Sequence, residues 1–136
     1  MNKKLNLIIL GSSGQLGKEF RELSNQYSQD MNFNFLSKKK FDVTKDKDLS
    51  AYLSDGSENI IINCSAYTKV DLAEKETEEA MLINGFSLKN ITKIANDNNS
   101  TLLHFSTDYV FSGNTNTPYT EEDKTDPHTI YGESKL

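Results

Sequence analysis

Residues 5–17 read Leu-Asn-Leu-Ile-Ile-Leu-Gly-Ser-Ser-Gly-Gln-Leu-Gly, and the predicted architecture of the chain starts from them. The first six residues form a nearly continuous apolar run, which is typical of a strand buried on both faces of a parallel sheet. Glycines follow, and a helix is predicted over 15–27, because apolar side chains recur at helical spacing at Leu16, Phe20, Leu23 and Tyr27. A strand, a glycine loop and a helix in this order make up half of a βαβ unit.

The rest of the chain continues the alternation. Short apolar or alternating runs predict strands at 32–36, 59–63 and 101–106. Helical spacing predicts a short helix over about 45–53, a long one over about 70–96 with Gly85 as a candidate break, and the start of another at 131–136, after a surface loop at 112–126. This order predicts the α/β class, as a Rossmann-type doubly wound parallel sheet with right-handed crossovers.

Composition sets the limits for this fold. The 136 residues, 35% hydrophobic and 26% charged, suit one globular domain over 1–136. A net charge of -5 argues against a broad nucleic-acid surface, and no apolar run is long enough to span a membrane. The only cysteine, Cys64, has no partner for an internal disulfide, so we expect a cytoplasmic protein. His104 and His128 have no third ligand at metal spacing, so no metal is expected.

The glycine loop indicates what the domain binds. Gly11, Gly14 and Gly17 stand between the first strand and the first helix. There the backbone can approach a pyrophosphate, and the helix start offers unpaired N–H groups and a positive dipole end. The alternative is a tight turn with no ligand. The flanking strand and helix favour dinucleotide binding.

The end of the second strand bears on which dinucleotide is bound. A site that selects NAD usually places an acidic residue there, to bind the ribose 2'-hydroxyl. This chain instead has Ser37-Lys38-Lys39-Lys40. A hydroxyl and cations suit a 2'-phosphate, so the sequence favours NADPH, with NADH as the other possibility. A solvated turn of lysines is the competing interpretation.

Tyr131 and Lys135 are the candidate catalytic pair. They are four residues apart, so on a helix they share one face. A nearby ammonium favours phenolate and brings tyrosine into a useful range as a general acid or base. If the tyrosine protonates the carbonyl oxygen of a substrate, Thr107, at the carboxyl end of the last predicted strand, could hydrogen-bond that same oxygen. These three residues predict reduction of a ketone by hydride transfer with proton donation.

Together these residues resemble the dTDP-4-dehydrorhamnose reductase family of extended short-chain dehydrogenases. The similar segments are 14–17 (GQLG), 63–68 (NCSAYT), 70–74, 106–111 (STDYVF), 113, 118–119 and 131–136 (YGESKL). The resemblance spans nearly the whole chain. Related sugar-nucleotide dehydratases typically have Thr-Asp-Glu where this chain has Thr107-Asp108-Tyr109, which favours a reductase.

The resemblance implies a role for each matching residue. Catalysis would rest on Thr107, Tyr131 and Lys135, and substrate contact on Thr107, Asp108 and Tyr109. The cofactor would be contacted by Gly11, Gly14, Gln15, Leu16, Gly17, Ser37, Lys38, Asp42, Val43, Ala66, Tyr67, Tyr131 and Lys135. For Asp42, an ordinary position at a helix entry is an equally good interpretation, and for Tyr67 and Tyr109 so is aromatic packing at strand ends.

The implied reaction is reduction of the C4 ketone of dTDP-4-dehydro-L-rhamnose to dTDP-L-rhamnose with NADPH or NADH. Family members run far past residue 136, so the resemblance implies an incomplete NAD(P)-binding domain that lacks the last strands and the substrate lobe. Full-length members could form homodimers. Exposed sheet edges would make the isolated chain poorly soluble or dependent on a partner.

Two other functions remain open. One is a non-catalytic, cofactor-binding regulatory subunit like that of methionine adenosyltransferase. The other is a different NAD(P)-dependent sugar-nucleotide epimerase or dehydratase.

Overall fold

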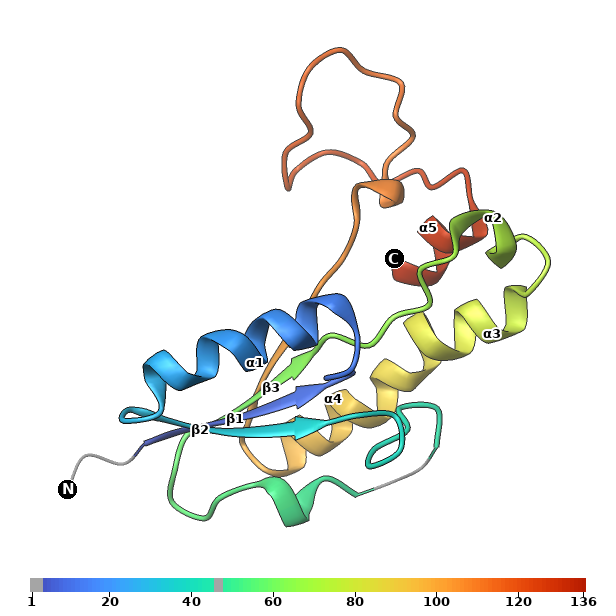
Figure 1. Ribbon diagram of the computed structural model, residues 1–136. Helices are drawn as coiled ribbons and strands as arrows, with labels where there is room; N and C mark the ends of the chain where they lie inside the picture. Colours follow the sequence, from blue (N-terminus) through green and yellow to red (C-terminus); the bar gives the residue numbers. More distant parts are fainter. Residues whose placement is uncertain (1–3, 46–47) are drawn as a thin grey trace.

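The computed structural model describes residues 4–45 and 48–136, and within these ranges four strands form one parallel sheet (Figure 1). The strands are β1 (Leu5–Leu10), β2 (Met31–Leu36), β3 (Asn59–Asn63) and β4 (Thr101–His104). Their order is β2-β1-β3-β4, with β1 and β3 in the centre. The predicted α/β Rossmann-type sheet is therefore confirmed.

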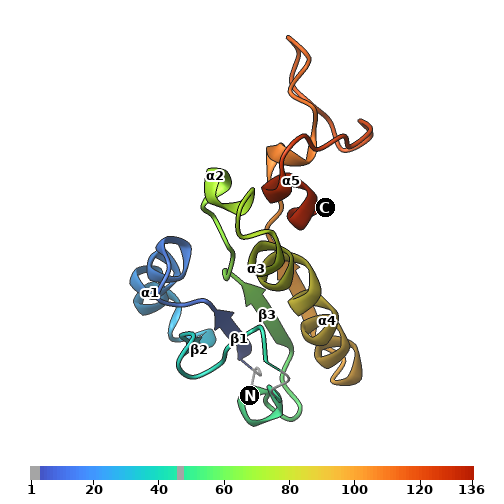
Figure 2. The same ribbon diagram turned by 90° about the vertical axis from the view of Figure 1, so that its right-hand side faces the viewer.

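Helices lie on both faces of the sheet (Figure 2). On one face α1 (Gln15–Tyr27) packs through Phe20 against Leu7, Ile9 and Ile62. On the other face α4 (Ser87–Asp97) packs against the alternate strand residues Ile8, Leu10 and Ile61. Because neighbouring side chains of a strand point to opposite faces, each central strand is buried on both sides. That is why residues 5–10 form an almost unbroken apolar run.

The helix predicted over 45–53 is wrong. Residues 46 and 47 lie outside the described part of the chain, and the described residues 45 and 48–53 form only a 3-10 turn, η1 (Ser50–Tyr52). Apolar side chains between β2 and η1 are buried one by one, with Phe41, Val43 and Leu49 inserted into the cluster beneath α4. A connection that buries single side chains in this way needs no helical periodicity.

The single long helix predicted over 70–96 is also wrong. The segment forms α2 (Val70–Ala73), α3 (Thr77–Met81), a π turn η2 (Leu82–Phe86) and then α4. A turn at 74–76 separates α2 from α3. At Gly85, the candidate position for a break, the chain stays helical but widens from α-helix into the π turn.

The chain beyond β4 carries little regular structure. β4 ends at His104 rather than at 106, because its partner β3 ends at Asn63, the residue that pairs with His104. A 3-10 turn, η3 (Asp108–Val110), comes next. The predicted loop at 112–126 then extends away from the sheet, and α5 (Ile130–Lys135) returns the chain to the carboxyl ends of the strands (Figure 1).

Two other kinds of feature are absent from the described ranges. No helix in residues 4–45 and 48–136 is long and apolar enough to cross a membrane. The same residues contain no group of three or more His, Cys, Asp or Glu side chains arranged to hold a metal ion.

Candidate functional site

The glycine loop is shaped by contacts with the ends of three strands. Gly11 has a φ of 69°, a left-handed conformation that side chains rarely adopt. A Cβ atom on Gly11 would also lie 2.6 Å from the backbone nitrogen of Ser65, just after β3. The loop is further held by the bond from the Ser12 N–H to the Leu36 carbonyl at 3.1 Å. The first glycine is therefore required both by conformation and by space.

The first turn of α1 is left open toward solvent. Gly14 is its N-cap, no side chain caps the helix, and the first turn has no acidic residue. Gly17 brings the helix against the loop, because a Cβ there would lie 2.5 Å from the Ser12 Cα. Gln15 and Leu16 are exposed. This is the open, positively polarised helix start that a pyrophosphate requires.

Two cavities meet at the glycine loop. The first, which we call the β2 cavity, has a volume of about 270 Å³ and includes Gly11, Gly14 and Ala66 in its lining. The second, which we call the central groove, has a volume of about 490 Å³ and runs from Gly14, Gln15 and Leu16 past Ala66 to Tyr131 and Lys135. Gly14 and Ala66 line both cavities. The loop thus lies between a cavity near β2 and the candidate catalytic pair.

The predicted cofactor residues after β2 are only partly gathered at the β2 cavity. Lys38, Asp42 and Val43 line it, whereas Ser37 is not among its lining residues. Asp42 accepts hydrogen bonds from the Thr44 N–H at 3.1 Å and hydroxyl at 2.8 Å. The Thr44 bonds, helped by the charge of Lys38, hold the pKa of Asp42 below its usual value. A carboxylate and an ammonium thus face one small cavity.

Tyr67 points away from both cavities. Its ring is buried, and its hydroxyl donates to the Glu76 carboxylate at 2.5 Å. Burial, reinforced by Glu76, raises the pKa of Tyr67 to about 12, so the phenol stays protonated. The Tyr67 ring therefore packs in the interior as an aromatic side chain. Of the two residues Ala66 and Tyr67, Ala66 is the one that lines the cavities.

A buried amide ties the Tyr67 segment to α5. Asn84, within the π turn, accepts from the Tyr67 N–H at 2.8 Å and donates to the Tyr67 carbonyl at 3.0 Å. Its amide nitrogen also donates to the Ser134 hydroxyl at 2.8 Å. Ser134 lies between the two candidate catalytic residues, so the π turn aligns the helix that carries them.

The start of α5 is fixed by two further contacts. The Thr129 hydroxyl accepts from the Gly132 N–H at 3.0 Å, and the Glu74 carboxylate, from just after α2, accepts from the Ile130 N–H at 2.9 Å. Gly132 lies against η3, where a Cβ would come within 2.2 Å of the Tyr109 carbonyl oxygen. A helix of six residues is too short to persist alone, so these contacts hold it.

Lys135 reaches back to the end of β4. Its ammonium donates to the Phe105 carbonyl at 2.5 Å and lies 3.3 Å from Nε2 of His104. Burial lowers the pKa of Lys135 from its ordinary value. Burial and the Lys135 charge lower the pKa of His104 to about 4. The imidazole is therefore neutral near pH 7.

The predicted substrate residues lie beside the central groove. The Tyr109 ring meets the Tyr131 ring edge-on at 5.4 Å between centroids, and 44% of Tyr109 is exposed. Thr107 and Asp108 line a separate shallow cavity, which shares Ser106 with the groove. The Thr107 hydroxyl donates to the Asp108 carboxylate at 3.1 Å and accepts from the Tyr109 N–H at 3.3 Å. The structure thus joins Tyr109 to Tyr131 directly and leaves Thr107 in the neighbouring cavity.

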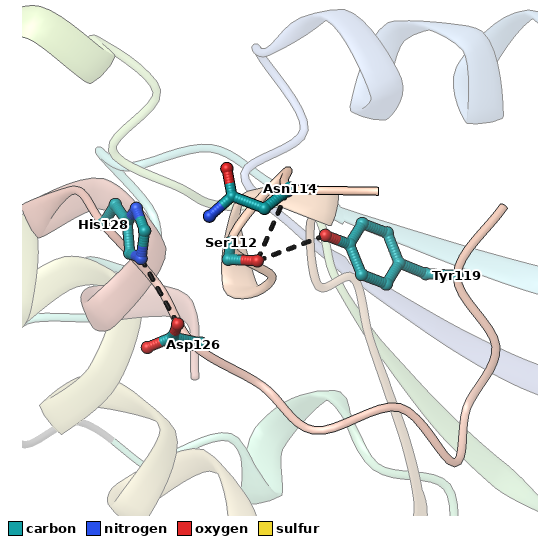
Figure 3. Close-up of polar contacts among 5 residues, drawn as sticks. All are labelled: Ser112, Asn114, Tyr119, Asp126 and His128. Carbon is teal, nitrogen blue, oxygen red and sulfur yellow. Dashed lines mark hydrogen bonds and ion pairs between the residues drawn. The ribbon is translucent and has the colours of Figure 1, made fainter. Parts of the chain in front are cut away.

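The loop at 112–126 has its own polar contacts (Figure 3). The Ser112 hydroxyl lies 3.4 Å from the Tyr119 hydroxyl and accepts from the Asn114 N–H at 3.4 Å. Where the loop returns, His128 lies 3.3 Å from the Asp126 carboxylate. The two histidines are thus in different settings: His104 is half-buried against Lys135, whereas His128 is exposed.

Three residues of the site had no predicted role: Glu74, Asn84 and His104. Asn84 had a weak signal, because it is a polar residue at a position that helical spacing would bury. For His104, the sequence pattern bears only on metal binding and does not indicate a contact with Lys135. No local pattern indicates that the Glu74 carboxylate meets a helix start 56 residues later in the chain.

Comparisons with known proteins agree with this geometry. The model of the RmlD substrate binding domain family matches residues 5–136. The dTDP-4-dehydrorhamnose reductase of Escherichia coli strain K12 is 36% identical over 133 residues, covering 97% of this chain. The chain spans only 44% of that relative's length.

Solved structures give the same result. A Bacillus anthracis dTDP-4-dehydrorhamnose reductase in complex with NADP matches with a TM-score of 0.87 and 36% identity, over 98% of this chain and 46% of that one. An ortholog from Clostridium acetobutylicum matches with a TM-score of 0.85 and 30% identity, over 95% of this chain and 45% of that one.

Proposed function

This chain belongs to the RmlD substrate binding domain family, and we propose that it supplies the NADPH site and catalytic pair of a dTDP-4-dehydrorhamnose reductase. The reaction would be reduction of the C4 ketone of dTDP-4-dehydro-L-rhamnose to dTDP-L-rhamnose. The observation that carries this proposal is the central groove, because the start of α1 and the Tyr131–Lys135 pair line the same cavity. The relatives' names and the NADP in the Bacillus anthracis structure support the choice of substrate and cofactor.

The residues present fit a nicotinamide dinucleotide. The exposed Gly14 lines both cavities without a side chain, and the uncapped α1 start offers N–H donors to a pyrophosphate. Lys38 would meet a 2'-phosphate at the β2 cavity, and Gly11, Gly14, Gln15, Leu16 and Gly17 would bind the pyrophosphate. Asp42, Val43 and the Ala66–Tyr67 backbone would border the cofactor, while Ser37 stands further from the cavity. Bound NADPH would supply the hydride.

In this mechanism the chain's own residues manage the proton and the orientation of the substrate. Tyr131 donates its phenolic proton to the carbonyl oxygen as the C4 carbon accepts a hydride, and solvent later returns the proton. Lys135 is anchored at the Phe105 carbonyl. It would hold a positive charge on the same face of α5 as Tyr131. Thr107 and Asp108 would bind sugar hydroxyls, and Tyr109, whose edge touches Tyr131, would border the sugar.

The cellular location follows from the same proposal. A nucleotide-sugar substrate and a reduced nicotinamide both belong to the cytoplasm, and a lone cysteine suits a reducing compartment. Cys64 is half-buried, and burial raises its pKa to about 11, so it remains a thiol.

The proposal is tested by substituting the tyrosine. In a protein that contains this chain and turns over, Tyr131→Phe should lower kcat for dTDP-4-dehydro-L-rhamnose by roughly 10²- to 10⁴-fold, the usual share of a general acid. NADPH binding, measured by calorimetry, should stay within about twofold, because a phenol-to-phenyl change leaves the α1 start intact. Nicotinamide absorbance follows the turnover.

Tyr27→Phe is the matched control, because Tyr27 is the exposed last residue of α1 and lines neither the β2 cavity nor the central groove. It should leave kcat nearly unchanged. NADPH binding without any turnover of the dTDP-sugar would instead favour a cofactor-binding regulatory subunit.

A further inference from the structure

His104 has a position that no catalytic role yet explains. It is the last residue of β4, pairs with Asn63 in register, and is half-buried. Its Nδ1 lies 3.3 Å from the amide nitrogen of Asn63, and its Nε2 lies 3.3 Å from the Lys135 ammonium. The imidazole therefore stands directly between a buried amide and the candidate catalytic lysine.

The orientation of the Asn63 amide is fixed from its other side. Its oxygen accepts from the Ser65 N–H at 3.1 Å and also from the Ser65 hydroxyl. A backbone N–H can only donate, so the amide oxygen must face Ser65 and the amide nitrogen must face His104. Asn63 thus presents a donor to Nδ1.

The Lys135 ammonium presents a second donor, to Nε2. A neutral imidazole has one N–H and one lone pair, so it can accept only one of these two hydrogen bonds. A bond from an ammonium is about twice as strong as one from a neutral amide. Lys135 should therefore take the lone pair at Nε2 and leave the hydrogen on Nδ1, against the preference of Asn63.

We propose that His104 is a positioning residue for Lys135, and that the lysine charge sets the imidazole in its Nδ1–H tautomer. Together with the Phe105 carbonyl, Nε2 then gives the ammonium two fixed acceptors. These two bonds use two of the three ammonium hydrogens and leave one for the central groove. The role of Lys135 in turnover rests on the proposed function. The predicted tautomer of His104 is independent of it.

The neutral state of His104 is consistent with this arrangement. Its pKa is lowered to about 4, first by burial and then by the Lys135 charge. Near pH 7 the imidazole therefore carries one N–H hydrogen. NMR can show directly which of the two ring nitrogens carries it.

The experiment is a long-range ¹H–¹⁵N NMR spectrum of the side chains near pH 7. The chain has two histidines, so a His128→Asn variant identifies the His104 signals by elimination. The expected result is a protonated Nδ1 and an unprotonated Nε2 for His104. An Nε2–H tautomer in the unsubstituted chain would overturn the proposal.

Two variants separate the influence of the lysine from that of the amide. Lys135→Met removes the ammonium, so Asn63 alone should decide and His104 should change to the Nε2–H tautomer. Asn63→Leu removes the competing donor and should keep Nδ1–H. If Lys135→Met folds and leaves the tautomer unchanged, Lys135 does not set it.

Turnover gives a second readout in a protein that contains this chain. The amide oxygen of His104→Gln can replace the Nε2 acceptor, whereas His104→Phe cannot. We expect kcat to fall about tenfold in His104→Phe and about twofold in His104→Gln, with substrate KM unchanged in both. Equal losses of kcat in the two variants would contradict a positioning role. Failure of the proposed function would leave the tautomer result readable.

Discussion

The glycine loop and helix α5 face the same groove, yet they are held by different kinds of contact. The loop is held by backbone bonds to residues next to it in the fold, such as that from Ser12 to the end of β2. α5 is held through side chains: Glu74 and Asn84 bond to it from distant segments, and its own Lys135 donates to the Phe105 carbonyl. The loop is held by close backbone contacts with the ends of strands, whereas α5 is held mainly through side chains.

This difference means that the two regions should fail in different ways. A change in the loop should disturb cofactor binding and the central strands together, because the loop shares their backbone bonds. A change in the α5 contacts should free six residues while the sheet persists.

Gly11→Ala is the strongest test of the loop. The φ of 69° and the contact of 2.6 Å with Ser65 leave no room for a Cβ. Left-handed strain and overpacking together should lower the free energy of unfolding by about 4 kcal/mol. Urea denaturation measures this loss. A loss below about 1 kcal/mol would show that the loop is more adaptable than its contacts indicate.

Gly132→Ala applies the same change to α5. The new Cβ would meet the Tyr109 carbonyl, so the free energy of unfolding should fall by about 3 kcal/mol if the helix stays docked. If α5 instead detaches from η3, the free energy of unfolding measured in urea falls less. The amide hydrogens of α5 then exchange rapidly with solvent.

Gly85→Ala is the matched control for this substitution. A Cβ at Gly85 makes only an ordinary contact of 3.5 Å with the Ser134 carbonyl. It should leave the protein equally stable, or more stable by up to about 1 kcal/mol.

Acidification should weaken the contact between β4 and α5. The pKa of His104 is about 4 when folded and 6.5 when unfolded, so the unfolded chain binds more protons between these pH values. The free energy of unfolding should therefore fall as the pH drops from 6.5 to 4, by about 2 kcal/mol once partial exposure is allowed for. In His104→Gln this part of the pH dependence should disappear. An identical dependence in both proteins would rule out His104 as its source.

Among the four predicted losses of stability, from Gly11→Ala, Gly132→Ala, acidification and Glu74→Ala, that of Glu74→Ala should be the smallest. It removes the carboxylate that accepts from the Ile130 N–H, an exposed cap that contributes about 1 kcal/mol. Glu78→Ala, on the exposed side of α3, makes the same change in charge away from α5. Amide exchange should accelerate in α5 for the first variant only. Equal acceleration in both would point to net charge rather than capping.

The same contrast explains which features could be predicted from sequence. Strands β1 and β3 and helix α1 were predicted at their observed bounds, because burial on two faces and helical spacing are local patterns. The glycine loop was predicted for the same reason. Tyr131 and Lys135 were found as a pair on one helix.

The errors arise where tertiary contacts outweigh local periodicity. The segment 70–96 has helical spacing throughout, but it bends at 74–76 and widens at Asn84, where side chains bond to Tyr67 and α5. The segment 45–53 buries Leu49 without a regular helix. Such outcomes depend on partners far away in the sequence.

The central claim is that the glycine loop and α5 form one NADPH site. It is tested most directly by titrating NADPH into the ¹⁵N-labelled chain and following its amide signals. We predict saturable shifts in residues 11–17 and 131–135 together, with the same apparent Kd for both groups. Shifts confined to one group, or no saturation, would contradict a shared site.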